Sequence, residues 1–217
     1  STEDEHGANV AVGYNALASQ NAGAEAYNTA VGYQSGQVIS TGIQNTILGA
    51  LAGDALTTGS ENVAIGAYAL STEDAHGANT AVGNAALMTL DAGANAYNVA
   101  VGYNAGLAMS TGQRNTIMGG AAGDALTTGS DNVAIGYGAL SAEDTGGKNV
   151  AVGRGALGTL DAGADGYNVA LGYYSGLAMT TATQNVTIGY NAAYALTTGT
   201  SNVVIGTNAM IAADGSE

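Results

Sequence analysis

Apolar and polar positions follow one short pattern that recurs along the whole chain. The pattern reads Asn, then Val or Thr, then a variable residue, then Val, Ile, Leu or Met, then Gly, as in residues 9–13 and 62–66. A few apolar, β-branched residues between Asn and Gly are typical of a short strand, and frequent Gly opposes a helix. The pattern therefore predicts a short strand at each occurrence.

The strands are expected at regular intervals. The Asn of the pattern occurs at Asn9, Asn28, Asn45, Asn62, Asn79, Asn98, Asn115, Asn132, Asn149, Asn168, Asn185 and Asn202. The intervals run 19, 17, 17 and 17 residues and then repeat, which divides the chain into superrepeats of 70 residues at 1–70, 71–140 and 141–210, with 211–217 starting a further one. Similar strands at a constant interval are typical of solenoid coils stacked in register. We expect one all-β domain over residues 1–217, a parallel β-solenoid of about 12 coils.

The outward side of these strands is expected to mediate self-association. Alternate strand residues share a face, and we assign the residues on either side of the variable one, such as Val10 and Val12, to the interior. The variable residue then points outward: Ala11, Ala30, Ile47, Ala64, Ala81, Ala100, Ile117, Ala134, Ala151, Ala170, Thr187 and Val204. A strand apolar on both faces is normally buried on both. The alternative is that small residues are merely tolerated on the surface.

Two further features concern packing between coils. Asn side chains at one position of successive coils can hydrogen-bond along the rod, so we predict an Asn ladder through the twelve Asn residues named above. Eight and eleven residues after the Asn, small and large residues exchange places: Gly53 precedes Leu56 in one coil, and Leu70 precedes Glu73 in the next. We interpret this exchange as core volume supplied from either column.

The repeat resembles a known family. Asn-Val-Ala-Val-Gly at residues 9–13 and Asn-Val-Ala-Ile-Gly at 62–66 and 132–136 resemble the repeat of trimeric autotransporter adhesin heads, and Asn-Thr-Ala-Val-Gly-Tyr at 28–33 is similar to repeats in bacteriophage tail fibres. Over about residues 9–210, the resemblance implies a left-handed parallel β-roll, three chains around one axis and a role in attachment. It places Val10 and Val12 in the roll and Ala11 at the trimer axis. The chain departs from that family in its longer coils and in showing no signal peptide, coiled-coil stalk or membrane anchor.

Composition narrows the function classes. The chain has 3 Lys+Arg against 17 Asp+Glu, a net charge of −14, and no Cys. We therefore expect no basic patch for nucleic acids and no disulfide or thiolate metal site. No nucleophile, base and orienting group recur together, so we do not expect an enzyme. Acidic charge would keep a rod with an apolar strip in solution.

Metal binding is not predicted. His6 and His76 share one repeat phase but lie four coils apart, roughly 19 Å at the usual strand spacing, which is too far for one ion. We interpret them as solvated loop residues. Adjacent acidic residues occur at Glu3–Asp4, Glu73–Asp74 and Glu143–Asp144. Such pairs could bind Ca²⁺ weakly, but they lack the ligand spacing of calcium loops, so we predict no cofactor.

Exposed tyrosines are candidates for ligand contact. Six of them directly follow the Gly of the pattern: Tyr14, Tyr33, Tyr103, Tyr137, Tyr173 and Tyr190. Tyr rings can stack on sugars and hydrogen-bond their hydroxyl groups. The alternative, which the repeat phase favours, is that these rings cover corners or stack on one another.

Together these features predict a non-catalytic, extracellular or cell-surface protein that forms a fibre or an adhesin head. Its partners would be further copies of itself, as a homotrimer or a filament, and a cell-surface glycan or matrix; we expect neither nucleic-acid binding nor membrane insertion. A bacteriophage tail-fibre shaft is the first alternative. An ice-binding solenoid is the second, although the Thr rows it needs, such as Thr57 and Thr58, are interrupted in half of the coils. Residues 211–217 repeat the phase of residues 1–7, which suits a longer fibre or copies stacked end to end.

Overall fold

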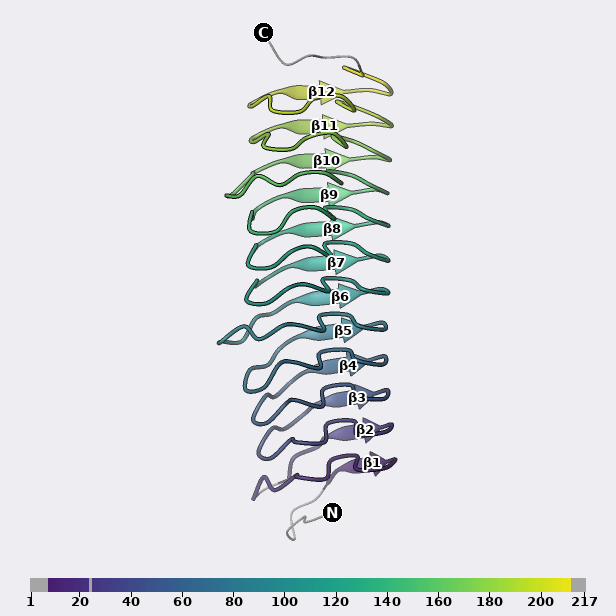
Figure 1. Ribbon diagram of the computed structural model, residues 1–217, viewed down its shortest axis with the longest axis vertical. Helices are drawn as coiled ribbons and strands as arrows, with labels where there is room; N and C mark the ends of the chain where they lie inside the picture. Colours follow the sequence, from purple (N-terminus) through teal and green to yellow (C-terminus); the bar gives the residue numbers. More distant parts are fainter. Residues whose placement is uncertain (1–7, 24, 212–217) are drawn as a thin grey trace.

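The computed structural model describes residues 8–23 and 25–211, which form a slender rod of stacked coils (Figure 1). Each coil contributes one three-residue strand: β1 (Val10–Val12), β2 (Thr29–Val31), β3 (Thr46–Leu48), β4 (Val63–Ile65), β5 (Thr80–Val82), β6 (Val99–Val101), β7 (Thr116–Met118), β8 (Val133–Ile135), β9 (Val150–Val152), β10 (Val169–Leu171), β11 (Val186–Ile188) and β12 (Val203–Ile205). The strands form one parallel sheet in chain order. The predicted all-β parallel solenoid is confirmed.

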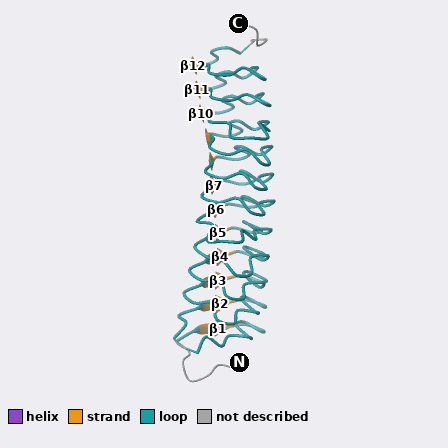
Figure 2. Cartoon of the chain, turned by 90° about the vertical axis from the view of Figure 1, so that its left-hand side faces the viewer, coloured by secondary structure: helices purple, strands orange, loops and turns teal. Residues whose placement is uncertain are grey.

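The sheet occupies one side of the rod, and turns make up the rest of each coil (Figure 2). Equivalent motif positions pair across every junction, as Ala30 pairs with Ala11 on one side and with Ile47 on the other. The coils with two extra residues keep this register, because the extra residues are taken up in a loop that projects beyond the other coils between β5 and β6 and between β9 and β10.

The turns depend on left-handed backbone. In the coil of β3, three turn residues have positive φ: Leu51 at 56°, Gly53 at 51° and Glu61 at 60°. Non-Gly residues pay about 1 kcal/mol or more in this region. A single coil is therefore strained by itself, and stacking on its neighbours must offset the strain.

The Gly that ends each strand is required by both conformation and space. Gly102 has a φ of 142°, and a Cβ built on it would lie 2.5 Å from the carbonyl oxygen of Gly119 in the next coil. The same close approach recurs through this column, which explains why no other residue occupies it.

The orientation of the strands is opposite to the one we expected. The middle residue points into the rod: Ala30, Ala64 and Ile117 are fully buried within one chain, whereas Val63 and Ile65 on either side of Ala64 face outward and are half-buried. The residues predicted to form a self-association face are therefore core residues, apart from Ala11, which is exposed in the first coil. They cannot form an interface between folded copies.

The physical reason is the narrow interior. A three-residue strand directs one side chain inward, toward a turn that already supplies a large residue such as Leu56 or Leu70. Where the middle residue is larger, it uses the space beside a Gly of the turn: Cδ1 of Ile47 lies 3.2 Å from where a Cβ of Gly53 would stand. This extends the exchange of small and large residues predicted between the two turn columns.

Candidate functional site

The outward side chains of the sheet form the most extensive candidate surface. We call this surface the outer sheet face and define it as the first and third residues of strands β1 to β12. Every one of these residues is Val, Ile, Leu, Met or Thr, and none is charged. Large members stand well out of the surface, with Leu48, Met118 and Leu171 exposed by 46%, 41% and 36%. Sequence reasoning missed this face because it assigned these residues to the core.

The outer sheet face is continuous along the rod. Parallel strands lie about 4.8 Å apart and rise about 3.3 Å per residue, so twelve strands of three residues make a strip of roughly 50 by 10 Å. An area on the order of 500 Å² is as large as the largest apolar patch on a typical monomeric protein. An exposed apolar strip of this size is typical of a surface that binds another molecule.

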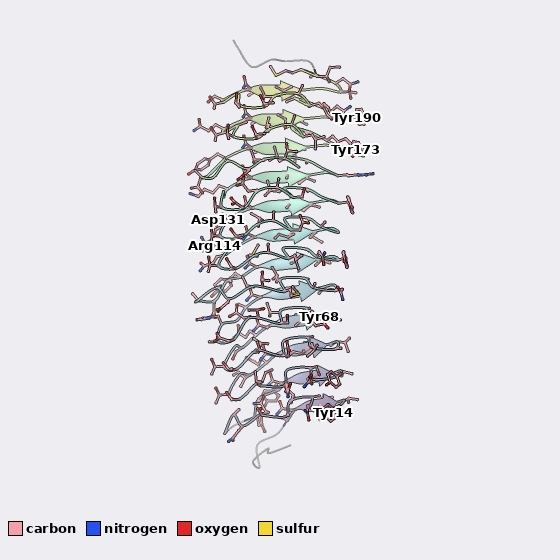
Figure 3. All side chains as sticks on the ribbon, in the orientation of Figure 1. Tyr14, Tyr68, Arg114, Asp131, Tyr173 and Tyr190 are labelled. Carbon is pink, nitrogen blue, oxygen red and sulfur yellow. The ribbon has the colours of Figure 1, made fainter. Side chains whose placement is uncertain are left out.

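Where the strands end, a column of residues borders this face, and six of its twelve positions are Tyr; we call it the tyrosine column. Figure 3 shows Tyr14, Tyr173 and Tyr190 beyond the carboxyl ends of the strands. All six tyrosines of the predicted contact set are exposed. Tyr14 stacks on Tyr33 with ring centroids 5.5 Å apart, and Tyr173 stacks on Tyr190 at 5.5 Å. Four of the six thus form stacked pairs, and the rings still reach solvent; contact with a glycan stays a prediction.

Arg154 interrupts the tyrosine column and packs against its neighbours. Its guanidinium lies 5.6 Å from the centroid of the Tyr137 ring and 5.8 Å from that of Tyr173. Arg over an aromatic face is a favourable arrangement. The cation therefore belongs to the column and does not form a separate anion site.

Two ion pairs connect coils at the opposite edge. Arg114 donates hydrogen bonds to both carboxylate oxygens of Asp131, at 2.7 and 3.1 Å (Figure 3). Lys148 Nζ lies 2.6 Å from Asp165 Oδ2. The hydrogen bond to Asp165 raises the pKa of Lys148, and the hydrogen bond from Arg114 lowers the pKa of Asp131. These exposed pairs contribute little to stability but keep the few cations neutralised.

The Asn side chains form a continuous buried ladder. Asn115 Oδ1 accepts the backbone N–H of Asn132 at 2.9 Å, while Asn115 Nδ2 donates to the carbonyl oxygen of Gly129 at 2.9 Å. Bonds from backbone N–H to Oδ1 link each Asn to the one before it, from Asn28 on Asn9 to Asn202 on Asn185. The side-chain amides of the ladder are engaged in hydrogen bonds within the protein, so we do not assign a ligand site to them.

Two glutamates of the adjacent acidic pairs, Glu73 and Glu143, are fully buried. Glu143 Oε1 accepts from the Gly146 N–H at 2.8 Å, and Oε2 accepts from the Ala162 N–H at 3.3 Å. Glu73 makes the corresponding bonds to His76 at 3.1 Å and Ala92 at 3.4 Å. Burial raises the pKa of both carboxyl groups. Their column holds an apolar residue in most other coils and Gln20 in the first, and this is the signal in the sequence that indicates burial.

The acidic residues near these glutamates gather into two clusters. In each cluster the potential ligand atoms lie within 4.8 Å of one another: Glu73, Asp74, His76 and Asp91 in the first, and Glu143, Asp144 and Asp161 in the second. Carboxylate oxygens are ligands that Ca²⁺ accepts. The glutamate oxygens already accept hydrogen bonds from backbone N–H groups, so in this geometry they stabilise the surrounding loops. His76 is half-buried beside Glu73, which corrects its interpretation as a solvated residue, and Glu3, Asp4 and His6 lie outside the described residues.

Comparison with known proteins adds no family to this picture. No protein-family model, no curated protein and no solved structure matches the chain. Within residues 8–23 and 25–211 there is no helix of the length and hydropathy needed to cross a membrane.

Proposed function

We propose that this chain is a non-catalytic structural rod of an extracellular fibre or adhesin head, and that copies associate side by side through the outer sheet face. One observation carries the proposal: in every coil, the outward side of the sheet is apolar or Thr and never charged. A chain with a net charge of −14 that keeps one whole side free of charge suits a surface that becomes covered.

The size of the outer sheet face supports this role. Two strips of roughly 500 Å² placed face to face bury on the order of 1,000 Å², which meets the minimum expected of a biological interface. Association costs about 4–15 kcal/mol or more before any net affinity appears, and area alone does not set the affinity, so the strength of the contact is left to the test below.

The flanking columns support an attachment role for the assembled rod. The tyrosine column lies beside the outer sheet face and stays exposed, so sugars of a cell-surface glycan could stack on its rings. The same geometry would serve the shaft of a bacteriophage tail fibre, which also needs a stiff rod that binds its own copies.

The proposal is tested by charging the outer sheet face. Ile65→Lys and Ile135→Lys together place one Lys at the same point of two superrepeats, and outward positions should accept them without loss of fold. We expect wild-type protein to sediment as an oligomer and the double variant to dissociate with an association constant lowered tenfold or more, about 1.4 kcal/mol or above. Circular dichroism checks that the fold is retained.

A matched control adds the same charge elsewhere. Thr58→Lys with Thr128→Lys alters two exposed turn residues with the same spacing of 70 residues. This variant should remain oligomeric. A monomeric wild-type protein would contradict the proposal. Strong thermal hysteresis from such a monomer would instead assign the face to ice, although the bulky Leu48, Met118 and Leu171 make it uneven for that purpose.

A further inference from the structure

Two rods can meet symmetrically through the outer sheet face in two ways. The face is a strip roughly five times longer than it is wide, so two copies cover it only when they lie side by side. A two-fold axis along the rod makes the copies parallel, and a two-fold axis along the strands makes them antiparallel. Parallel copies bring each coil against the same coil of the other copy, with opposite edges of the two sheets in contact. Antiparallel copies reverse the order of the coils and bring the same edge of both sheets together.

The third residue of each strand varies in size with the superrepeat. We number the coil types 1 to 4 in chain order, so the coils of β1, β5 and β9 are type 1. This third residue is Val in every type 1 coil and Ile in every type 4 coil. In type 2 coils it is Val31, Val101 and Leu171, and in type 3 coils it is Leu48, Met118 and Ile188. Types 1 and 2 are therefore the smaller coils on this face, and types 3 and 4 are the larger ones.

One antiparallel register places each smaller coil type opposite a larger one. When type 1 faces type 4, the reversed order of the coils makes type 2 face type 3. Every other antiparallel register sets some coils of like size against each other, and parallel copies do so at every coil. Two surfaces fill the space between them evenly only when large residues meet small ones. The size pattern therefore favours this antiparallel register.

The charges at one edge of the sheet fit the same register. We call the residues directly before each Asn of the pattern the leading column, to which Arg114 and Asp131 belong (Figure 3). Lys148 occupies this column in a type 1 coil, and Glu61 occupies it in a type 4 coil. Glu61 is exposed and has no ion-pair partner among the residues that the structure describes. Antiparallel copies would supply one, because type 1 coils then face type 4 coils along the same edge.

Parallel copies would instead bring like charges together. Lys148 lies before β9 and Arg154 follows it, at opposite edges of one coil. With parallel rods, the leading column of one copy lies against the tyrosine column of the other, so Lys148 would face Arg154 on both sides of the axis. Two of the three cations of the chain would then face each other. Juxtaposed like charges oppose association.

We propose that two copies pair in antiparallel orientation through the outer sheet face, about a two-fold axis that runs along the strands between β6 and β7. The inference rests on the proposed side-by-side association and specifies how the partner lies in it. The axis sets β4 opposite β9, so Lys148 of each copy faces Glu61 of the other. It also sets Arg114 against the Tyr97 ring of the other copy, a favourable contact. An axis between β8 and β9 keeps the same coil types together but gives Lys148 the carboxylate of Asp131, which Arg114 already binds through two hydrogen bonds.

The same axis pairs the third residues along the whole face. The facing residues are Val12 with Ile205, Val31 with Ile188, Leu48 with Leu171, Ile65 with Val152, Val82 with Ile135, and Val101 with Met118. Five of these six pairs join a Val to a larger residue, and only Leu48 with Leu171 joins two large ones. The two surfaces thus complement each other at nearly every level of the rod.

Cross-linking through introduced Cys residues reads the orientation directly, because the chain has no Cys of its own. Ile65→Cys and Val152→Cys alter outward positions of β4 and β9, which lie five coils or roughly 24 Å apart in one chain. We expect a short bis-maleimide to link the variant that carries both changes into dimers. Each single variant is the matched control and should stay unlinked, because its Cys lies five coils from the Cys of the other copy.

Exchange of charges tests the register a second time. Lys148→Glu should lower the association constant roughly threefold to tenfold, and adding Glu61→Lys should restore it. These two positions are too far apart to interact within one chain, so the restoration has to act between copies. Adding Ser201→Lys instead is the matched control: it puts the same charge in the leading column of another type 4 coil, which faces the coil of β1. This control should leave association weak.

The outcomes separate this inference from the function on which it rests. Wild-type protein that sediments as a monomer would overturn both. A trimer, or an oligomer in which Ile65→Cys alone becomes linked, would leave side-by-side association standing and overturn the antiparallel pair. A double Cys variant that stays unlinked, or Ser201→Lys that restores association as well as Glu61→Lys does, would overturn the register.

Discussion

Single residues in this rod are constrained by what stands directly above and below them. The Gly column shows two separate constraints, because each residue needs a positive φ and its Cα lies under the backbone of the next coil. Most positions carry both constraints, but Gly206 of the β12 coil carries only the first: its φ is 127°, and among the residues that the structure describes a Cβ there would meet nothing closer than Ala209 Cβ at 3.8 Å.

Gly102→Ala and Gly206→Ala therefore separate strain from crowding. Both should lose about 1–3 kcal/mol from the unfavourable φ. Gly102→Ala must also displace backbone that lies 2.5 Å from the new Cβ, so we expect it to destabilise by several kcal/mol more or to prevent folding. Denaturant midpoints measure the loss of stability in each variant. Equal losses would show that the backbone of the next coil can move aside to accept a Cβ at Gly102.

The Asn ladder allows a similar comparison. Asn115→Ala leaves the buried Asn132 N–H and Gly129 carbonyl without their partners, so we expect a loss of about 2 kcal/mol or more. Asn202→Ala, in the last coil, removes the Nδ2 bond to Asn185 Oδ1 at 3.0 Å and should cost less than about 1 kcal/mol. Thermal unfolding of both variants measures the two losses of stability. A larger loss in Asn202→Ala than in Asn115→Ala would contradict the prediction that interior members of the ladder contribute more to stability.

At the scale of the coil, alternation along a strand determines which side chains share a face but not which face is inside. The sequence pattern predicts Val and Ile in the core and the middle Ala on the surface, and the structure has the opposite arrangement. The coil interior is too narrow for the predicted arrangement, because its volume is filled mainly from the turn. The sequence held a partial signal: Ile replaces Ala in the middle of the strand at Ile47 and Ile117, in coils whose turn has Gly53 and Gly123, although Ala30 and Ala100 are kept in coils with Gly36 and Gly106.

Two of the 19-residue coils are hydrogen-bonded to a buried glutamate of the preceding coil, Glu73 through the Ala92 N–H and Glu143 through the Ala162 N–H. Burial raises the folded-state pKa of Glu143 above its ordinary value of 4.5. A raised pKa means that the stabilising contribution is complete below the unfolded pKa and is lost as pH rises through the folded pKa. The protein should therefore gain stability on acidification from neutral pH toward pH 4.5.

Glu143→Gln tests this pH dependence. The Gln side chain stays neutral and keeps one acceptor for the Gly146 or Ala162 N–H. Its denaturation midpoint should rise less than that of wild type between pH 7 and pH 4.5. Glu61→Gln, an exposed change of the same chemistry, should keep the wild-type rise. Equal rises in wild type and Glu143→Gln would show that this carboxyl group does not carry the effect.

At the scale of the whole molecule, the repeat predicted the number of coils, their parallel register and the position of every strand. Periodicity is a property of the chain alone, and similar units stacked in order admit few arrangements. The functional surface could not be obtained in the same way, because a face becomes a candidate only after inside and outside are assigned. The buried role of Glu73 and Glu143 depends on contacts to the following coil, which spacing alone does not reveal.

The direction of the hydrogen bonds has a mechanical consequence. Since the strands run across the rod, the bonds between coils lie along its axis, and a pull on the two ends is borne by those bonds in series and not by the covalent backbone. Peeling one 17-residue coil gives up about 4.8 Å of rod and releases up to roughly 60 Å of extended chain. A rod anchored at both ends would therefore yield coil by coil and lengthen more than tenfold in each freed segment, which makes it a reserve of length under tension.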